Sequence, residues 1–213
     1  MESVIDPGSP LGECRAHLVA ETDAQLRTLD QLAVRTGFRT VVHGEPGRFS
    51  ESRSAIYFFF HFQISRAYRH GMLGALRAHP DPTIRFAPAI MIIGMSTATE
   101  IAGYIEEGFD DIVSLPEKAP TLTRRFASQL ETLIGYYETP TYFGPDRRRM
   151  ELVRPSGADN RGKGNYQHRR YSIRRTAQTG VQVVSRELII NGMSAVPLSR
   201  MTQKPLWTAS QTG

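Results

Sequence analysis

The segment Ile56-Tyr57-Phe58-Phe59-Phe60 constrains the fold more than any other part of this sequence. It is apolar at every position, whereas a strand with one face in water alternates apolar and polar residues. Ala89–Ile93 has the same character. Such runs are typical of parallel strands that helices cover on both faces. The sequence therefore predicts a central parallel sheet that contains both segments.

Strands and helices alternate around these two segments as far as residue 137. Shorter strands are expected at 16–20, 40–43 and 111–115, and helices at 24–36, 69–78, 98–107 and 120–137. Asp23 is the expected N-cap of the first helix, and Thr97 and Glu100 form a capping box before the helix at 98–107. The helix at 69–78 is counted as the third, so that five strands and five helices are expected in alternation, which indicates an α/β fold with a doubly wound, five-stranded parallel sheet.

The long final helix is predicted from its apolar spacing. Its apolar residues recur at steps of three and four, which is the helical period: Leu122, Phe126, Leu130, Leu133, Ile134 and Tyr137. We expect the folded domain to span residues 14–138, between a leader at 1–13 and an extension at 139–213.

Composition narrows the class of protein. The formal net charge of +5 suits an anionic partner but does not require one. Cys14 is the single cysteine, so the chain has neither an internal disulfide nor a thiolate metal cluster, which fits a reducing cytoplasm. Residues 1–13 lack the basic and apolar order of a secretory signal, and no apolar run reaches the length of a membrane span. A cytoplasmic protein without a membrane span is expected.

The stretch Gly108-Phe109-Asp110-Asp111-Ile112-Val113-Ser114-Leu115-Pro116 resembles a segment of bacterial response-regulator receiver domains, Gly-Ala-Asp-Asp-Tyr-Leu-Thr-Lys-Pro. The order of elements before it also fits that family, exemplified by the chemotaxis response regulator. The resemblance implies a flavodoxin-like receiver fold. It also implies an aspartate nucleophile after the third strand, an acidic Mg²⁺-binding pair after the first, a hydroxyl after the fourth, and a lysine before a cis proline.

Each of these chemical positions is altered in this sequence. His61 stands where the resemblance implies the phosphorylated aspartate, and Ala20 and Glu21 stand at the acidic pair. The hydroxyl position falls on Ile93 or Gly94, and the lysine position falls on Leu115, before Pro116. We therefore expect a degenerate pseudo-receiver that is not an enzyme and binds no metal or cofactor.

Three structural expectations follow for this altered pocket. His61 is interpreted as a structural histidine bonded to a backbone carbonyl, with a phosphohistidine or a pH switch as the alternatives. Leu115 is expected to enter the former pocket beside His61. The Leu115-Pro116 bond is expected to be cis, as the resemblance implies.

Beyond residue 138 the composition becomes basic, and Gly144-Pro145-Asp146-Arg147-Arg148 resembles an extension that follows some alphaproteobacterial receivers. The candidate residues for binding an anion or a nucleic acid are Arg147, Arg148, Arg149, Arg169, Arg170, Arg174 and Arg175. The alternatives are an irregular, partly disordered solubilising tail, or an arm that wraps an acidic face of its own domain. Residues 181–184 and 188–190 are expected to form short strands if the arm docks.

Two classes of function remain open. The first is a phosphorylation-independent adaptor of a two-component phosphorelay, which binds a histidine kinase, a response regulator or itself through the face of the fourth helix, fifth strand and fifth helix. The second is a protein that binds nucleic acid or a cyclic dinucleotide through its arginines. Arg170 and Arg174 have the Arg-x-x-x-Arg spacing of PilZ domains, but Asn191-Gly192-Met193-Ser194 does not match the companion motif of that family.

Overall fold

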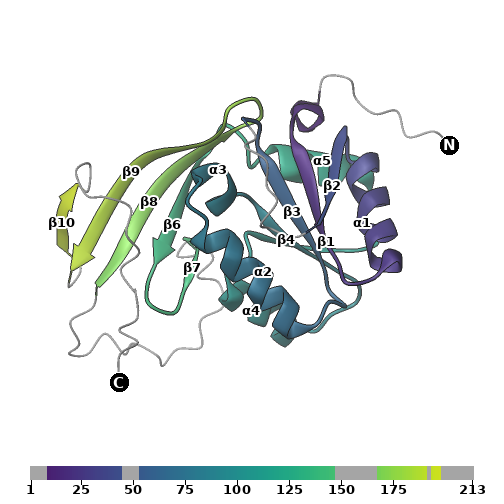
Figure 1. Cartoon of the computed structure of the whole chain (residues 1–213), viewed down its shortest axis with the longest axis horizontal. Helices are drawn as coiled ribbons and strands as arrows, with labels where there is room; N and C mark the ends of the chain where they lie inside the picture. The colour runs from purple at the N-terminus through teal and green to yellow at the C-terminus, as the bar shows by residue number, and fades with distance from the viewer. Residues whose placement is uncertain (1–8, 45–52, 147–166, 191–192, 198–213) are drawn as a thin grey trace.

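The structure is a computed structural model that describes residues 9–44, 53–146, 167–190 and 193–197. Two sheets lie side by side in it, and Figure 1 shows the helices packed around the first of them. No helix in the described part of the chain is long and apolar enough to cross a membrane.

The first sheet is parallel throughout, with five strands in the order β2-β1-β3-β4-β5. The strands are β1 (Arg15–Val19), β2 (Thr40–His43), β3 (Ile56–His61), β4 (Ala89–Ile93) and β5 (Asp111–Ser114). The order 2-1-3-4-5 is that of the flavodoxin-like doubly wound fold. The predicted fold class is confirmed.

Helices cover both faces of this sheet. They are α1 (Asp23–Arg35), α2 (Arg66–Ala78), the short α3 (Pro82–Arg85), α4 (Ala98–Glu107) and α5 (Ala119–Ala127). Tyr57 and Phe59 belong to the core beneath α1 and α5, whereas Phe58 and Phe60 belong to the core beneath α2, α3 and α4. Every residue of β3 is buried, which explains why this strand has no polar alternation. The alternation of strands and helices is less strict than predicted, because the described residues between β2 and β3 contain no helix.

Local capping signals are mostly confirmed. Thr97 and Glu100 form the expected capping box of α4, and Gly108 ends that helix in the left-handed conformation at φ +100°. The N-cap of α1 is Thr22, which forms a capping box with Gln25, and not Asp23. Asp23 is the first helical residue instead, where its charge still complements the helix dipole.

The prediction of a long final helix is wrong beyond Ala127. Helix α5 ends there, and β6 (Leu133–Glu138) begins after a turn in which Glu131 has φ +58°. The apolar residues of 130–137 satisfy a helical period, but the alternation of Ile134, Tyr136 and Glu138 also satisfies the strand period of two. β-branched and aromatic side chains favour the strand, which has a partner in β8.

A second, antiparallel sheet has the strand order β10-β9-β8-β6-β7. Its further strands are β7 (Phe143–Pro145), β8 (Gln167–Thr176), β9 (Gly180–Ile190) and β10 (Met193–Pro197). The expected irregular extension is thus a regular sheet where the structure describes it, and the two short strands expected near 181–190 are parts of β9. Strand β6 lies before the division expected at residue 138. In the expected leader, Pro10–Glu13 form a 3-10 turn whose Leu11 is buried in the first core.

The second sheet packs at the amino-terminal end of the parallel sheet. Phe86, Tyr136, Tyr171 and Ile173 form an apolar cluster between the two. The amide of Ala55, directly before β3, donates to the carbonyl of Ala177 at 2.9 Å. The carboxyl ends of the parallel strands therefore lie at the edge opposite this contact.

Candidate functional site

The altered pocket lies at the carboxyl edge, which is the edge formed by the carboxyl ends of the parallel strands. In the sheet register His61 pairs with Ile92, and Ile93 pairs with Ser114. The amide of Leu115 donates to the carbonyl of Ile93 at 2.8 Å. Because β1 also ends at this edge, the structure brings together the predicted set: Ala20, Glu21, His61, Ile93, Gly94, Leu115 and Pro116.

His61 is a buried side chain, with 5% of its surface exposed. Its Nδ1 accepts a hydrogen bond from the amide of Gln63 at 3.2 Å, and its ring stacks on Phe62 with centroids 4.9 Å apart. The expected bond to a backbone carbonyl is not found among the described residues. Because Nδ1 is an acceptor, a neutral ring carries its proton on Nε2. Burial lowers the pKa of His61, which favours this neutral form.

The carboxylate of Glu21 is hydrogen-bonded to the residue at the start of α2. This carboxylate accepts hydrogen bonds from the amide of Ser65 at 2.6 Å and from the hydroxyl of Ser65 at 2.8 Å. These two bonds lower the pKa of Glu21. Since Ser65 is the N-cap of α2, the carboxylate ties the loop after β1 to that helix instead of facing an open pocket.

A Mg²⁺ site is not favoured by these side chains. Mg²⁺ prefers carboxylate and other oxygen ligands, yet the described residues contain no group of three His, Cys, Asp or Glu side chains that could hold a metal ion. Ala20 supplies no ligand, and both oxygens of Glu21 already accept bonds from Ser65.

Apolar side chains occupy the hydroxyl and lysine positions. Ile93 is buried in the core beneath α2, and the carbonyl of Gly94 accepts a bond from the hydroxyl of Ser114 at 3.1 Å. Leu115 is half-buried and packs against the core that Ala20 also contacts. The Leu115-Pro116 bond is cis, as expected. Contact between Leu115 and His61 stays a prediction.

The candidate arginines fall into three groups. Arg147, Arg148 and Arg149 lie outside the described residues. Arg169 and Arg175 are buried on β8, and Arg170 and Arg174 are exposed on the same strand. The expectation that these four belong to a flexible arm is wrong, because β8 is paired with both β6 and β9.

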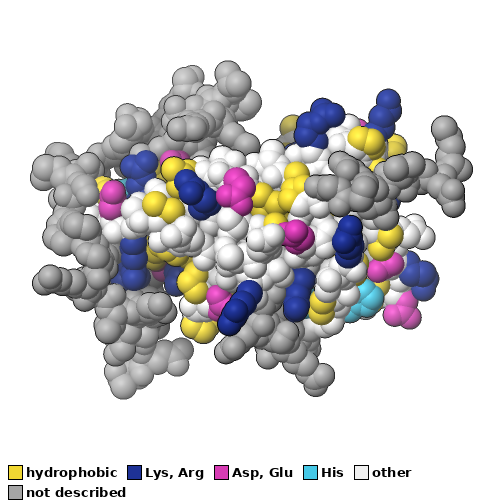
Figure 2. Space-filling view, turned by 90° about the horizontal axis from the view of Figure 1, so that it is seen from above, with side chains coloured by type: hydrophobic (Ala, Val, Ile, Leu, Met, Phe, Trp, Pro, Cys, Tyr) yellow, Lys and Arg dark blue, Asp and Glu magenta, His cyan; other side chains and the backbone are white. Residues whose placement is uncertain are grey.

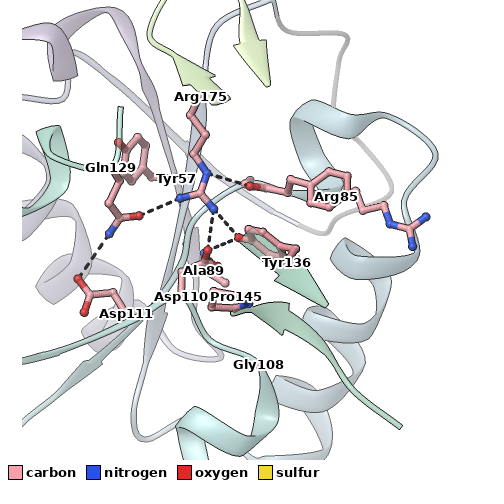
Figure 3. A network of polar contacts seen from close by, with 12 residues as sticks. Tyr57, Arg85, Ala89, Gly108, Asp110, Asp111, Gln129, Tyr136, Pro145 and Arg175 are labelled. Atoms are coloured by element: carbon pink, nitrogen blue, oxygen red, sulfur yellow. Dashed lines mark hydrogen bonds and ion pairs between the residues drawn. The ribbon is translucent and has the colours of Figure 1, made fainter. Parts of the chain in front are cut away.

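Arg175 belongs to a buried network centred on Asp110 (Figure 3). One oxygen of Asp110 lies 2.6 Å from a guanidinium nitrogen of Arg175, and the other lies 2.5 Å from Arg77 of α2. Tyr136 donates its hydroxyl proton to Asp110, and the amide of Ala89 donates at 2.9 Å. Burial alone raises the pKa of a carboxyl group, but the charges of Arg77 and Arg175 hold the pKa of Asp110 below its usual value.

Glu138 forms a second buried polar centre on β6. It lies 2.9 Å from Arg85 and 3.5 Å from Arg169, and the hydroxyl of Tyr171 donates to it at 2.5 Å. Sequence reasoning missed both centres, apart from placing Asp110 in the receiver-like stretch. Their partners lie far apart in the chain, and no local pattern links them.

A groove of about 670 Å³ lies between α2, α4 and the loop that joins β6 to β7. Gly74 and Gly103 form part of its wall, and a Cβ at either position meets no atom within 4 Å. Arg77 and Arg85 also line it, and the Nε atom of each is buried without a hydrogen-bond partner. Charges of both signs line this groove, which therefore favours no single ligand class.

Comparison with family models and with curated proteins gives no match. Among solved structures, the receiver domain of a histidine kinase from Syntrophus aciditrophicus is similar, with a TM-score of 0.41 and 19% identity over 55% of this chain and 92% of that one. A receiver domain from Rhodospirillum rubrum gives a TM-score of 0.37 at 10% identity, over 54% and 89% of the two chains. A response regulator of red light signalling in R. palustris gives 0.38 at 13%, with the same coverage.

These similarity scores are low, so the fold assignment depends on the strand order and register of this structure. The part of the chain that contains β1 to α5 has the strand order of the flavodoxin-like fold.

Proposed function

We propose that this chain is a signalling adaptor of a two-component system that binds a partner protein without being phosphorylated. The partner is a histidine kinase, a response regulator or a second copy of the chain, and the protein acts in the cytoplasm without a cofactor. The observation that carries the proposal is His61, a buried imidazole at the end of β3. An imidazole cannot form the acyl phosphate of an aspartate, so the usual on and off states of a receiver are not available.

The surroundings of His61 support the same conclusion. In a phosphorylated receiver the acidic pair must remain free to hold Mg²⁺, but Glu21 is held by Ser65. Leu115 carries no charge to place against a phosphoryl group. The edge of the sheet is therefore suited to a single, fixed conformation.

The surface proposed for the partner is the face of α4, β5 and α5. No residue of α4 is fully buried, and its half-buried Ile105 joins none of the apolar clusters in the described part of the chain. Ala102 lies on the same flank of the helix and is exposed. Arg125 pairs with Asp111 beside them and holds α5 against β5. This combination of an apolar contact and a charged border is typical of protein interfaces.

A capture experiment tests this proposal with point variants. A truncation at residue 138 is unsuitable, because it removes β8 from β6 and Arg175 from Asp110. The tagged full chain is used to capture partners from bacterial lysate, with and without acetyl phosphate and Mg²⁺. We expect equal capture in both conditions, and at least a tenfold loss with Ile105→Glu.

Gly103→Arg is the matched control, because it places a charge on the groove side of α4 at a position with free space. We expect it to leave capture unchanged. Capture that increases with acetyl phosphate, or that Gly103→Arg abolishes while Ile105→Glu does not, contradicts the proposal.

A further inference from the structure

The arginine-rich strand β8 separates its charges onto two faces. Successive side chains of a strand point to opposite sides. Arg169, Tyr171, Ile173 and Arg175 are buried, whereas Arg170 and Arg174 are exposed; His168, on the side of Arg170, is also buried. The buried set faces the rest of the protein, and the exposed set faces away from it. In Figure 1, β8 and β9 extend beyond the first sheet.

The two inward arginines are neutralised within the chain. Arg175 pairs with Asp110 at 2.6 Å, and Arg169 lies 3.5 Å from Glu138. Their charges are needed to balance buried carboxylates. They are therefore not available to an external ligand.

The two outward arginines have no such balance. The side chains of Arg170 and Arg174 form no hydrogen bond or ion pair within the part of the chain that the structure describes. Four residues of strand separate them, which corresponds to roughly 13 Å. Glu187 lies opposite Arg170 in the register of β9, but it does not pair with it in the described structure.

The neighbouring strands complete the face with one acidic side chain, Glu187, and with neutral side chains. In β6, Tyr137 lies opposite Arg170 and Leu133 lies opposite Arg174. Leu133 is 57% exposed, and Tyr137 is half-buried with its ring 5.1 Å from that of His168. In β9, Gln182 lies opposite Arg174. We name this surface the outer face, and it consists of Leu133, Tyr137, Arg170, Ser172, Arg174, Gln182 and Glu187.

Figure 2 shows the distribution of charge on one face of the molecule. On the face of the molecule seen there, Lys and Arg side chains are interspersed with Asp and Glu. An interspersed surface gives no strong field, whereas the two arginines of the outer face exceed its one glutamate and lie beside an aromatic ring, which suits anionic, stackable ligands.

We propose that the outer face binds single-stranded nucleic acid, with Arg170 and Arg174 on phosphates and Tyr137 stacked on a base. Guanidinium groups bind phosphate through parallel hydrogen bonds, and aromatic side chains on an open sheet stack on unpaired bases. A duplex fits less well, because its major groove admits a helix or a two-stranded ribbon, whereas Arg170 and Tyr137 belong to a wider sheet. This binding function is independent of the adaptor function proposed above.

Fluorescence anisotropy with labelled 20-nucleotide oligo(U) and oligo(dT) tests the proposal on the full chain. The double variant R170A/R174A is expected to bind at least tenfold more weakly than the wild type. The slope of log K against log salt concentration is expected to be less negative by about 1.4 for this variant. Two phosphate contacts are lost, and each contact on a single strand contributes about 0.7 to the slope. Tyr137→Ala is expected to weaken binding about fivefold or more, whereas Tyr137→Phe keeps the ring and most of the affinity.

The control is R27A/R124A, which removes the same charge from two exposed arginines of α1 and α5. It is expected to change the affinity less than twofold. The proposal is overturned if R170A/R174A binds as the wild type does, or if R27A/R124A weakens binding equally. It is also overturned if polyglutamate displaces the oligonucleotide as well as unlabelled oligo(U) does, because the face then recognises acidic protein.

Discussion

The carboxylate of Asp110 and the guanidinium of Arg175 form a buried ion pair that joins the parallel sheet to the second sheet. Their side chains are 4% and 1% exposed. Asp110 directly precedes β5, and Arg175 lies near the end of β8, so one pair connects segments 65 residues apart. The parallel sheet with its helices and the second sheet are thus expected to unfold as one unit.

Removing one partner of this pair is predicted to be strongly destabilising. Arg175→Met leaves Asp110 buried with the charge of Arg77 alone, and a broken buried pair costs about 3–5 kcal/mol. The free energy of unfolding from urea denaturation measures this loss. Arg125→Ala is the comparison, since Arg125 pairs with Asp111 but is 46% exposed. That change is expected to cost at most about 1 kcal/mol. If both variants lose the same unfolding free energy, the buried pair does not stabilise the protein more than the exposed pair does.

Replacement by alanine is predicted to change the stability of the protein in opposite directions at two glycines near the groove. Gly74 lies inside α2 with free space around a Cβ, so Gly74→Ala should stabilise the protein by about 0.5–1 kcal/mol. At Gly108, φ is +100° and a Cβ would lie 2.5 Å from the carbonyl oxygen of Phe143. Gly108→Ala should therefore destabilise the protein by more than about 1 kcal/mol. Thermal unfolding of both variants measures whether stability rises or falls. A loss of stability in Gly74→Ala contradicts the free space found around this position.

Acidification from pH 7 to pH 5 is predicted to reduce stability through His17. The side chain of His17 is 4% exposed, and its Nε2 lies 2.8 Å from the carbonyl oxygen of Gly44. Burial lowers the pKa of His17 despite that hydrogen bond. Below the ordinary histidine value of 6.5, the unfolded chain therefore binds a proton that the folded chain does not, and stability falls until the folded pKa is reached.

His17→Gln keeps a donor for Gly44 but does not titrate. The decrease in unfolding free energy between pH 7 and pH 5 should be smaller in this variant than in the wild type. An identical pH profile for His17→Gln and the wild type rules out this role of His17.

The sequence predicts the parallel sheet closely because its strands are marked by local signals. Ala89–Ile93 and Thr40–His43 have the expected bounds, and the capping box of Thr97 is formed. The misplaced strand β6 has a different cause. Its residues satisfy both periodicities, and the partner that selects the strand, β8, lies about 35 residues further along the chain.

The candidate site was predictable in position but only partly in detail. The resemblance to receiver domains placed His61 and Glu21 at the carboxyl edge, since parallel strands end at a common edge. It could not show that Ser65 would bind Glu21, because that contact depends on how α2 begins. The arginines illustrate the same limit: charge alone did not separate Arg175, which balances Asp110, from Arg174, which faces solvent.

Incubation of the purified full chain with acetyl phosphate and Mg²⁺, followed by intact mass measurement, tests most directly whether this receiver-like domain works without phosphorylation. With His61 at the end of β3 and Glu21 bound to Ser65, we expect no mass increase of a phosphoryl group, and none in a parallel incubation with a histidine kinase. An acid-labile, hydroxylamine-sensitive phosphoryl group within residues 14–138 is the result that contradicts this expectation.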